Sequence, residues 1–235
     1  MRVRRVVTTR AGGASRAPFD TFNLSVLVGD DPSAVAANRG RLAAGVGLRP
    51  ENVVWMRQVH SAVTATVTAP PGEDLCGVDA MVTDRPGLAL AVLAADCVPV
   101  LLADPSANVL GAAHAGRVGS ARGVLPSVLA AMVRLGARPF RVQALLGPSV
   151  CGRCYEVPAA MRDDVHAALP GSGCTTRDGR PGLDLRAGLR EQLRAHGVVQ
   201  VDTDPRCTVE DPTLYSHRRD GKTGRLAALT WLDPR

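Results

Sequence analysis

The sequence is poor in aromatic residues and in lysine. Tryptophan, tyrosine and phenylalanine make up only 3% of its 235 residues, and Lys222 is the single lysine among 28 basic residues. So few aromatics cannot build the stacking platform that binds single-stranded nucleic acid. The arginines are spread along the chain, which argues against a nucleic-acid-binding tail despite the net charge of +6. A small anionic ligand fits better, because planar guanidinium groups bind phosphate or carboxylate bidentately.

Long hydrophobic runs are also missing. The longest apolar stretch, residues 87–103, is interrupted by Asp96, whose charge would cost about 3 kcal/mol at the centre of a bilayer. Residues 1–8 are basic but lack the apolar core of a secretory leader. We therefore expect no membrane partner, a cytoplasmic location, and six cysteines that remain reduced thiols.

Length and periodicity predict one domain spanning residues 1–235, with a mixed α/β (α+β) fold in which helices flank mixed β-sheets. Runs of apolar or alternating residues predict nine strands: Val3–Thr8, Val53–Met56, Val63–Thr68, Leu88–Leu93, Val98–Ala103, Val109–Ala113, Val142–Leu146, Val198–Asp202 and Leu226–Leu232. Capping residues and helical spacing predict four helices: Pro32 to about Ala44 after Asp31, about Arg122 to Leu135, Pro158–Leu169, and a helix from Asp184 to Gly197.

The histidines narrow the search for catalytic or metal-binding residues, because the chain has only five. His60 and His114 each lie where a predicted strand passes into a loop, and Asp96-Cys97 lies between two predicted buried strands. Strand ends of one sheet can converge in space, and active sites are commonly built from such loops. An unpaired buried carboxylate is costly, so Asp96 needs a partner or a function.

One thiolate and two imidazoles form a good zinc set that leaves a fourth position open for water or substrate. Zinc held by His60, Cys97 and His114 would keep a local charge of about +1 and lower the pKa of a bound water towards 7. The ligands are 37 and 17 residues apart, which matches no compact zinc-binding pattern. Asp96 is then a candidate for proton transfer or for support of the metal ligands.

Other motifs are less specific. Cys151-Gly152-Arg153-Cys154 is a C-x-x-C without a second pair, which makes a zinc ribbon improbable and leaves a redox dithiol open. Residues 116–123 are glycine-rich but lack the lysine of a phosphate-binding P-loop, although they could hold an anion at a helix start. The deaminase H-x-E pattern is absent, because Ala62 stands where the glutamate belongs.

Several blocks, in one order along the chain, resemble the YfiH/DUF152 family. They are residues 8–15 (TTRAGGAS), 22–24 (FNL), 28–31 (VGDD), 38–39 (NR), 58–60 (QVH), 78–83 (VDAMVT), 95–100 (ADCVPV), 114–116 (HAG), 147–149 (GPS), 154–157 (CYEV), 215–219 (YSHRR) and 223–225 (TGR). Members of this family have been described as polyphenol oxidoreductases with a laccase domain, peptidoglycan editing factors, and purine nucleoside phosphorylases with adenosine deaminase activity. The resemblance places the family's zinc ligands on His60, Cys97 and His114.

One block departs from the family. The usual H-A-G-W-R-G is replaced by His114-Ala115-Gly116-Arg117-Val118-Gly119, so the aromatic residue is lost and the arginine stands one position earlier. Roles that the family assigns to that tryptophan or arginine therefore do not carry over directly. We expect Arg117 to restore the missing positive charge.

For function, the resemblance implies zinc-dependent phosphorolysis of adenosine, inosine and methylthioadenosine, with adenosine deamination at the same site. Asp96, Cys97 and His114 are the expected catalytic residues. Phosphate, ribose and base are expected to contact six further residues: Arg10, Arg39 and Arg117 for phosphate, Asn23 and Gln58 through hydrogen bonds, and Tyr155 by stacking. Copper could replace zinc in vitro, and the chain is expected to be a monomer or a homodimer.

Two alternatives remain from the sequence. The same zinc site could hydrolyse an amide and remove a wrongly incorporated amino acid from a cell-wall precursor. The chain could instead be a non-catalytic, metal-stabilised binding module, with Cys151 and Cys154 facing a redox partner. A true multicopper oxidase is disfavoured, because several copper sites need more imidazoles than five. The last two blocks, residues 215–219 and 223–225, form a closing motif. Its residues Arg218, Arg219 and Arg225 are as consistent with salt bridges that fix the C-terminal segment as with ligand contacts.

Overall fold

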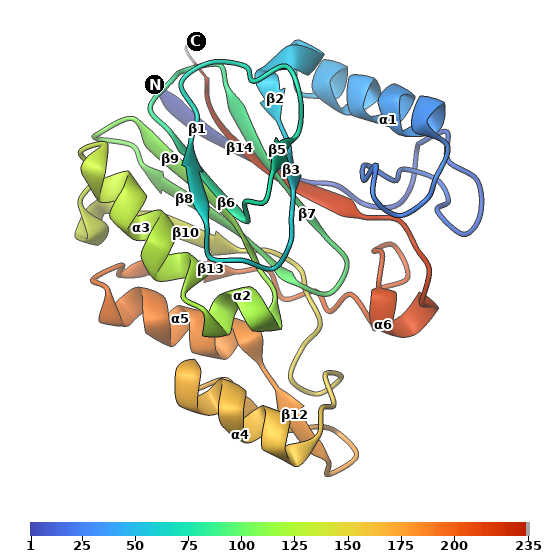
Figure 1. Cartoon of the computed structure of the whole chain (residues 1–235), viewed down its shortest axis with the longest axis vertical. Coiled ribbons are helices and arrows are strands. Elements are labelled where there is room, and N and C mark those ends of the chain that lie inside the picture. Colours follow the sequence, from blue (N-terminus) through green and yellow to red (C-terminus); the bar gives the residue numbers. More distant parts are fainter. Residues whose placement is uncertain (234–235) are drawn as a thin grey trace.

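Two mixed β-sheets form the centre of the computed structural model, which describes residues 1–233 (Figure 1). The four-stranded sheet has the order β1 (Arg2–Val7), β14 (Leu226–Asp233), β7 (Ala89–Ala94) and β2 (Val53–Val54). The six-stranded sheet has the order β13 (Gln200–Thr203), β10 (Gln143–Leu146), β8 (Val98–Asp104), β9 (Val109–Ala115), β6 (Ala80–Thr83) and β4 (Thr64–Thr66). Each sheet combines parallel and antiparallel pairs, which confirms the mixed fold.

The two sheets pack face to face, and the side chains of each central strand point alternately to the core between the sheets and to the opposite face. In β7, Leu90 and Val92 point to the core between the sheets, where they meet Leu101 of β8 and Leu110 of β9. The intervening residues of β7 belong to the opposite core. The central strands are therefore apolar on both faces, and their sequences read as continuous hydrophobic runs.

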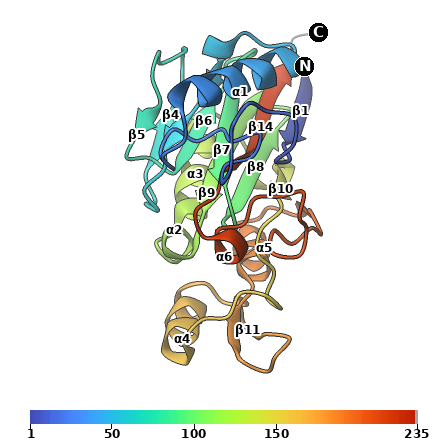
Figure 2. The ribbon, with the colours of Figure 1, turned by 90° about the vertical axis from the view of Figure 1, so that its right-hand side faces the viewer.

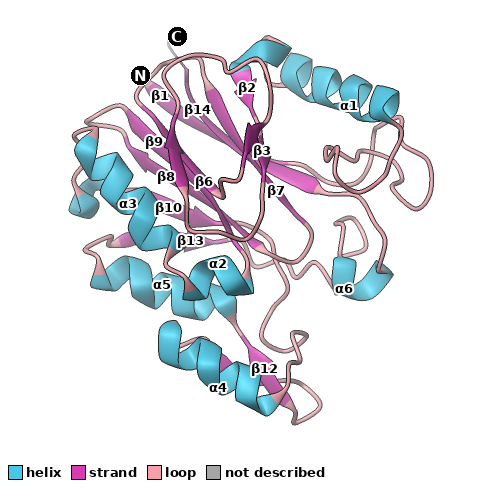
Figure 3. Cartoon of the chain, viewed as in Figure 1, coloured by secondary structure: helices cyan, strands magenta, loops and turns pink. Residues whose placement is uncertain are grey.

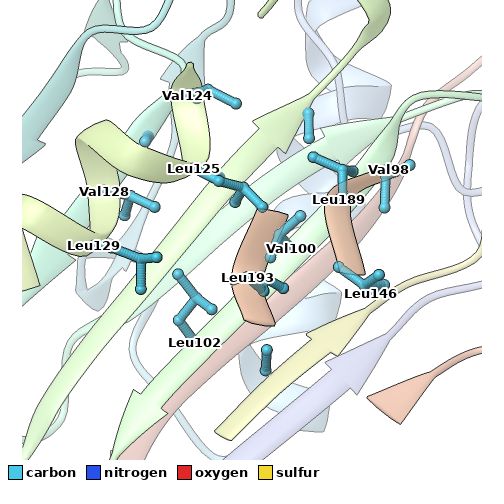
Figure 4. Packing of buried hydrophobic residues seen from close by; sticks show 14 of the residues in the cluster. Val98, Val100, Leu102, Val124, Leu125, Val128, Leu129, Leu146, Leu189 and Leu193 are labelled. Carbon is cyan, nitrogen blue, oxygen red and sulfur yellow. The ribbon is translucent and has the colours of Figure 1, made fainter. Parts of the chain in front are cut away.

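Helices cover the outer faces of both sheets. Helix α1 (Pro32–Gly45) packs on the four-stranded sheet, whereas α3 (Val124–Arg134) and α5 (Leu185–Ala195) pack on the six-stranded sheet. Figure 4 shows this second contact, in which side chains of both helices meet alternate residues of β8. Asp31 and Asp184 cap α1 and α5, as predicted. No helix within residues 1–233 combines the length and the hydrophobicity needed to cross a bilayer.

Smaller elements connect these layers (Figures 2 and 3). Helix α4 with the β11–β12 hairpin lies at the end of the molecule remote from the two termini, and α6 lies near the ends of β7 and β8. The bounds of these elements are β3 (Met56–Arg57), β5 (Leu75–Cys76), α2 (Arg117–Ala121), α4 (Ala159–Ala168), β11 (Gly173–Thr175), β12 (Pro181–Leu183), α6 (His217–Asp220) and the 3₁₀ turns Pro50–Asn52 and Pro139–Arg141.

All nine predicted strands are present, but some boundaries differ. The strand predicted over residues 53–56 is interrupted at Trp55, so that β2 and β3 join different sheets. The helix predicted from Arg122 begins only at Val124, because Gly123 has a left-handed backbone (φ 86°) that separates α2 from α3. Pro126 then lies in the first turn of α3, where it blocks no helical hydrogen bond.

Asp104, at the end of β8, is a buried carboxylate that connects two segments of the chain through hydrogen bonds. It accepts hydrogen bonds from the backbone N–H groups of Ser106, Ala107 and Arg138 and from Nε of Arg141. Burial alone would raise the pKa of Asp104, but these donors hold it below its ordinary value. The Asp104 carboxylate therefore joins the β8–β9 turn to the segment that precedes β10.

Asp104→Asn is expected to lower the free energy of unfolding by about 1–3 kcal/mol at pH 7. Because the folded-state pKa of Asp104 is depressed, its contribution is complete above the unfolded pKa of about 4 and is lost as the pH falls through the folded value. Urea unfolding at pH 7 and at about pH 3 should therefore give a smaller difference between the two proteins at the acidic pH. An equal difference at both values would contradict this role.

Candidate active site

The three predicted metal ligands converge although they come from different parts of the chain. His60 follows β3, Cys97 lies in the turn between β7 and β8, and His114 lies in β9. Their ligand atoms all lie within 4.8 Å of one another, and Cys97 Sγ is 3.7 Å from Nε2 of His60. The two imidazole rings meet edge to face, with their centroids 4.8 Å apart. The structure thus forms a group that could hold one metal ion.

Backbone strain is concentrated at this site. His60 and Asp96 are non-glycine residues with left-handed backbone, at φ 60° and 91°. Each such conformation costs about 1–3 kcal/mol and persists only where the surroundings hold it. The Asp96 carboxylate accepts hydrogen bonds from the hydroxyls of Thr208 and Ser216 and from the backbone N–H of Arg218. Asp96 thereby fixes the turn that presents Cys97, and it joins that turn to the segment before α6.

Asp79 was not predicted as a functional residue, yet it holds both histidine ligands. It is fully buried and accepts hydrogen bonds from the backbone N–H groups of Val59, His60 and Ser61. Its Oδ1 also lies 2.8 Å from Nδ1 of His114, which leaves Nε2 of that ring free for a metal. The sequence signal was a carboxylate placed directly before the buried strand β6.

The same contacts set the charges of the site. Burial would raise the pKa of Asp79, but hydrogen bonds from His114 and from the backbone lower it far below its ordinary value. Burial would also raise the pKa of Cys97, but His114 and His60 lower it to about 6. His114 in turn has its pKa raised to about 9 by Cys97 and Asp79, against the effect of burial. A metal ion would bind the Cys97 thiolate and would replace the proton on Nε2 of His114.

Gly116 allows the loop after β9 to approach the three ligands. A Cβ at this position would lie 2.7 Å from Cδ2 of His60 and 2.9 Å from Sγ of Cys97. Both distances are too short for atoms that are not bonded, so any side chain would displace a ligand. The lack of space next to His60 and Cys97 therefore explains why position 116 of the HAG block is a glycine.

Gly116→Ala is expected to weaken metal binding by about 10-fold or more, because the added methyl group displaces His60 or Cys97. Gly40→Ala in helix α1 is the matched control, since nothing lies within 4 Å of the place that its added methyl group would occupy. Metal affinity measured by competition with a chromophoric chelator tests this expectation. Equal affinity of both variants and the unmodified protein would show that the loop yields without moving the ligands.

Two adjoining cavities meet at Cys97, and the first of them is also lined by His60 and His114. The first, of about 340 Å³, is lined by Gln58, His60, His114 and Arg225 among others. The second, of about 380 Å³, is lined by Asp96, Arg117, Tyr155 and Arg218 among others. Both reach Cys97 and His217, so the thiol lies where the two cavities join. Volumes of this size suit small-molecule ligands.

Three of the predicted substrate-binding residues line these cavities. Arg117 and Tyr155 face the second cavity, where the shifted arginine of the HAG block stands beside an aromatic ring. Gln58 faces the first cavity, but its side-chain amide donates to Leu93 O and accepts from Leu93 N, both at 2.8 Å. Gln58 therefore fixes the end of β7 in addition to lining the cavity.

The other three lie outside the lining of both cavities. Arg39 forms a two-pronged ion pair with Asp74 and stacks on Trp55. Arg10 pairs with Asp20 and Asp220. These guanidinium groups are engaged by carboxylates of the chain itself, which reduces their capacity to bind an external anion.

Asn23, the third of these residues, is buried and forms hydrogen bonds to residues that line the first cavity. Its Oδ1 accepts from the backbone N–H groups of Ser25 and Arg225, and its Nδ2 donates to Asp30. Ser25 and Arg225 both line the cavity, so Asn23 acts on its shape through them.

The closing motif contributes residues that the sequence left undecided or did not single out. Arg219 donates to four backbone carbonyls and to Asp220, so it fixes this segment. Arg218 and Arg225 instead line the two cavities, and His217 reaches both. Hydrogen bonds from Ser216 and Arg218 to Asp96 bring the motif to the site, a contact between residues more than 100 positions apart.

Two packed mixed β-sheets with helices on their outer faces define the fold class of this chain, and solved structures share this fold. YlmD from Geobacillus stearothermophilus is similar with a TM-score of 0.92 and 34% identity, over 98% of this chain and 92% of that one. A protein from Neisseria meningitidis described as DUF152 gives a TM-score of 0.89 and 37% identity, over 98% and 94%. Residues 4–233 match the model of a family described as multi-copper polyphenol oxidoreductase laccase. The chain belongs to this family.

Two relatives carry the same activity in their names. A protein named purine nucleoside phosphorylase from Mycobacterium bovis is 59% identical over 99% of this chain and 93% of its own length. One with the same name from Corynebacterium glutamicum is 53% identical over 98% and 94%. The multi-copper description of the family does not suit the ligands at hand, because within residues 1–233 only one possible metal group contains histidine.

Proposed function

We propose that this protein is a zinc-dependent purine nucleoside phosphorylase that also deaminates adenosine. One observation carries the proposal: a His-Cys-His group lines one cavity, and its cysteine lies where a second cavity joins the first, in a chain closely related to named purine nucleoside phosphorylases. Phosphorolysis brings two substrates together, because an oxygen of phosphate bonds to C1′ of the ribose as the bond from C1′ to the base breaks. Two adjoining cavities provide the two places that this reaction needs.

The residues present suit zinc. His60, Cys97 and His114 supply two imidazole nitrogens and one thiolate, and Asp79 orients His114 in the manner typical of zinc-bound histidine. Zinc bound there would supply a Lewis acid that stabilises negative charge developing on the substrates. Copper binds the same donor types more strongly, so copper added in vitro would compete.

We assign phosphate to the second cavity. Arg117 and Arg218 both line it, and the Arg218 guanidinium lies 5.0 Å from the centroid of the Tyr155 ring. Burial raises the pKa of Tyr155, and the positive charges of Arg117 and Arg218 act against that rise. Two guanidinium groups beside one aromatic ring suit a small anion with several oxygens.

The nucleoside is then assigned to the first cavity. Its lining combines the apolar Leu27, Val28 and Met56 with the polar Gln58 and Arg225. Arg225 donates to the carbonyls of Thr223 and Gly224, which holds its guanidinium in place. Apolar walls with a few fixed polar groups are typical of sites that bind a heterocycle. Asp96 serves as a positioning residue, because three donors of the chain occupy its carboxylate.

The test is to incubate metal-quantified protein with adenosine or inosine, with and without phosphate, and to separate the products by chromatography. Free base and ribose 1-phosphate should accumulate only with phosphate, and inosine should form from adenosine in either case. Arg117→Gln should raise the KM for phosphate more than the KM for the nucleoside, whereas Arg122→Gln, just beyond α2 and outside both cavities, should leave both constants unchanged. No base release by zinc-loaded protein would refute phosphorolysis.

A further inference from the structure

A second group of metal-binding side chains lies outside the His60-Cys97-His114 site. Cys151, Cys154, Cys207 and Glu210 place three sulfur atoms and a carboxylate within 4.8 Å of one another. All four belong to loops: the first two follow β10, and the other two follow β13. The C-x-x-C pair that had no partner in the sequence thus has one in the fold, and the partner reads C-x-x-E.

The two loops have the same local geometry. Backbone N–H groups of Cys154 and Tyr155 donate to Cys151 O at 2.9 and 3.0 Å. In the other loop, the N–H groups of Glu210 and Asp211 donate to Cys207 O at 3.1 and 2.8 Å. Each loop is therefore a tight turn that directs its first and fourth side chains to the same side. Ligand pairs separated by two residues are the usual building blocks of structural zinc sites.

The turns are also joined to each other. The N–H of Cys151 donates to Sγ of Cys207 at 3.4 Å, and Ser149 pairs with Cys207 in a parallel β-bridge. The ligands are thus brought together by backbone contacts that do not depend on an ion.

The surrounding charges suit a divalent ion. Three thiolates and one carboxylate around such an ion leave a net charge of about −2. Two arginines are placed to balance it: Arg153 and Arg177 both donate to Glu210, and Arg177 also lies 2.7 Å from Sγ of Cys154. Sulfur donors favour zinc over calcium or magnesium, which prefer oxygen ligands.

We propose that Cys151, Cys154, Cys207 and Glu210 bind a second zinc ion with a structural role. Four protein ligands close the site, so this ion has no open position for a substrate. It would fasten the turn before Tyr155 to the turn that contains Thr208. Tyr155 lines the second cavity and Thr208 holds Asp96, so the ion would stabilise one wall of the candidate active site.

The experiment counts metal in protein whose first site has been removed. Cys97→Ala protein, stripped of metal and titrated with Co²⁺, should bind one equivalent and show intense sulfur-to-cobalt charge-transfer absorption. Adding Cys151→Ser and Cys207→Ser should abolish that absorption. Cys174→Ser is the matched control, because this thiol lies beside Gly152 O but outside the group, and the absorption should remain. These readouts do not depend on nucleoside turnover.

A milder variant keeps the proposal testable if the double substitution fails to fold. Glu210→Gln leaves all three thiols in place and should weaken Co²⁺ binding by about 10-fold or more while the circular dichroism spectrum stays unchanged. Cys97→Ala protein that binds no cobalt through sulfur would overturn the proposal. So would a disulfide among Cys151, Cys154 and Cys207, detected by alkylation and mass spectrometry of protein purified without reductant.

Discussion

Cys97→Ala protein is expected to lose the metal of the candidate active site and at least about 100-fold in kcat/KM for phosphate-dependent cleavage of inosine. The substitution removes the only sulfur ligand and the only negative charge of the His60-Cys97-His114 group. Two neutral imidazoles remain, and two ligands hold zinc far more weakly than three. Because Cys97 lies where both cavities meet, its loss affects the contact between the two substrates as well as metal binding.

Metal analysis and steady-state kinetics on the same preparation measure both effects. Cys76→Ala is the matched control, since Cys76 is an exposed thiol in β5 and belongs to neither metal-binding group. This control should retain full metal content and turnover. A Cys97→Ala protein that keeps both would remove the basis of the proposed metal-dependent mechanism. Retained metal with lost turnover would instead assign Cys97 a role in contacting substrate.

Asp79→Asn is expected to lower metal affinity by about 10- to 100-fold and the free energy of unfolding by about 1–3 kcal/mol. An asparagine keeps the size of the side chain but has one acceptor oxygen where the carboxylate has two. Its NH2 group would face the backbone donors of residues 59–61, which now all point at Asp79. The loop of His60 and the ring of His114 would lose their common anchor.

Calorimetric zinc titration and urea unfolding separate the two effects. Ser61→Ala is the comparison, because it removes a single hydroxyl donor to Asp79 and leaves the three backbone donors in place. We expect this variant to change metal affinity by less than about 3-fold. If Asp79→Asn reduced stability but left metal affinity unaltered, Asp79 would be a structural residue of the loop and not a positioning residue for the metal ligands.

Much of the fold follows from local sequence. Strands β7, β8 and β9 are continuous apolar runs, and such runs are typical of strands buried on both faces. Capping by Asp31 and Asp184 is equally local. Strands β5, β6, β11 and β12 were not predicted, because segments of two to four residues carry little periodicity and their pairing depends on distant partners.

The candidate site likewise contains some residues that the sequence could indicate and others that it could not. His60, Cys97 and His114 could be selected because each has a rare, chemically distinctive side chain at a strand end. Arginine is common in this chain, so its residue type carried little information. Arg10 and Arg39 fitted the expected chemistry as well as Arg117 did, but packing gives the first two carboxylate partners and leaves Arg117 facing a cavity.

The sequence by itself determined the apolar strands of the core and the three side chains of the candidate metal site, because hydrophobic periodicity and side-chain chemistry are local properties. Only the tertiary structure decided which polar side chains act together. Asp79 meets His114, Asp96 meets Ser216, and the C-x-x-C turn meets Cys207 and Glu210 across long separations in the chain. Such meetings depend on sheet register and loop packing, which no local pattern specifies.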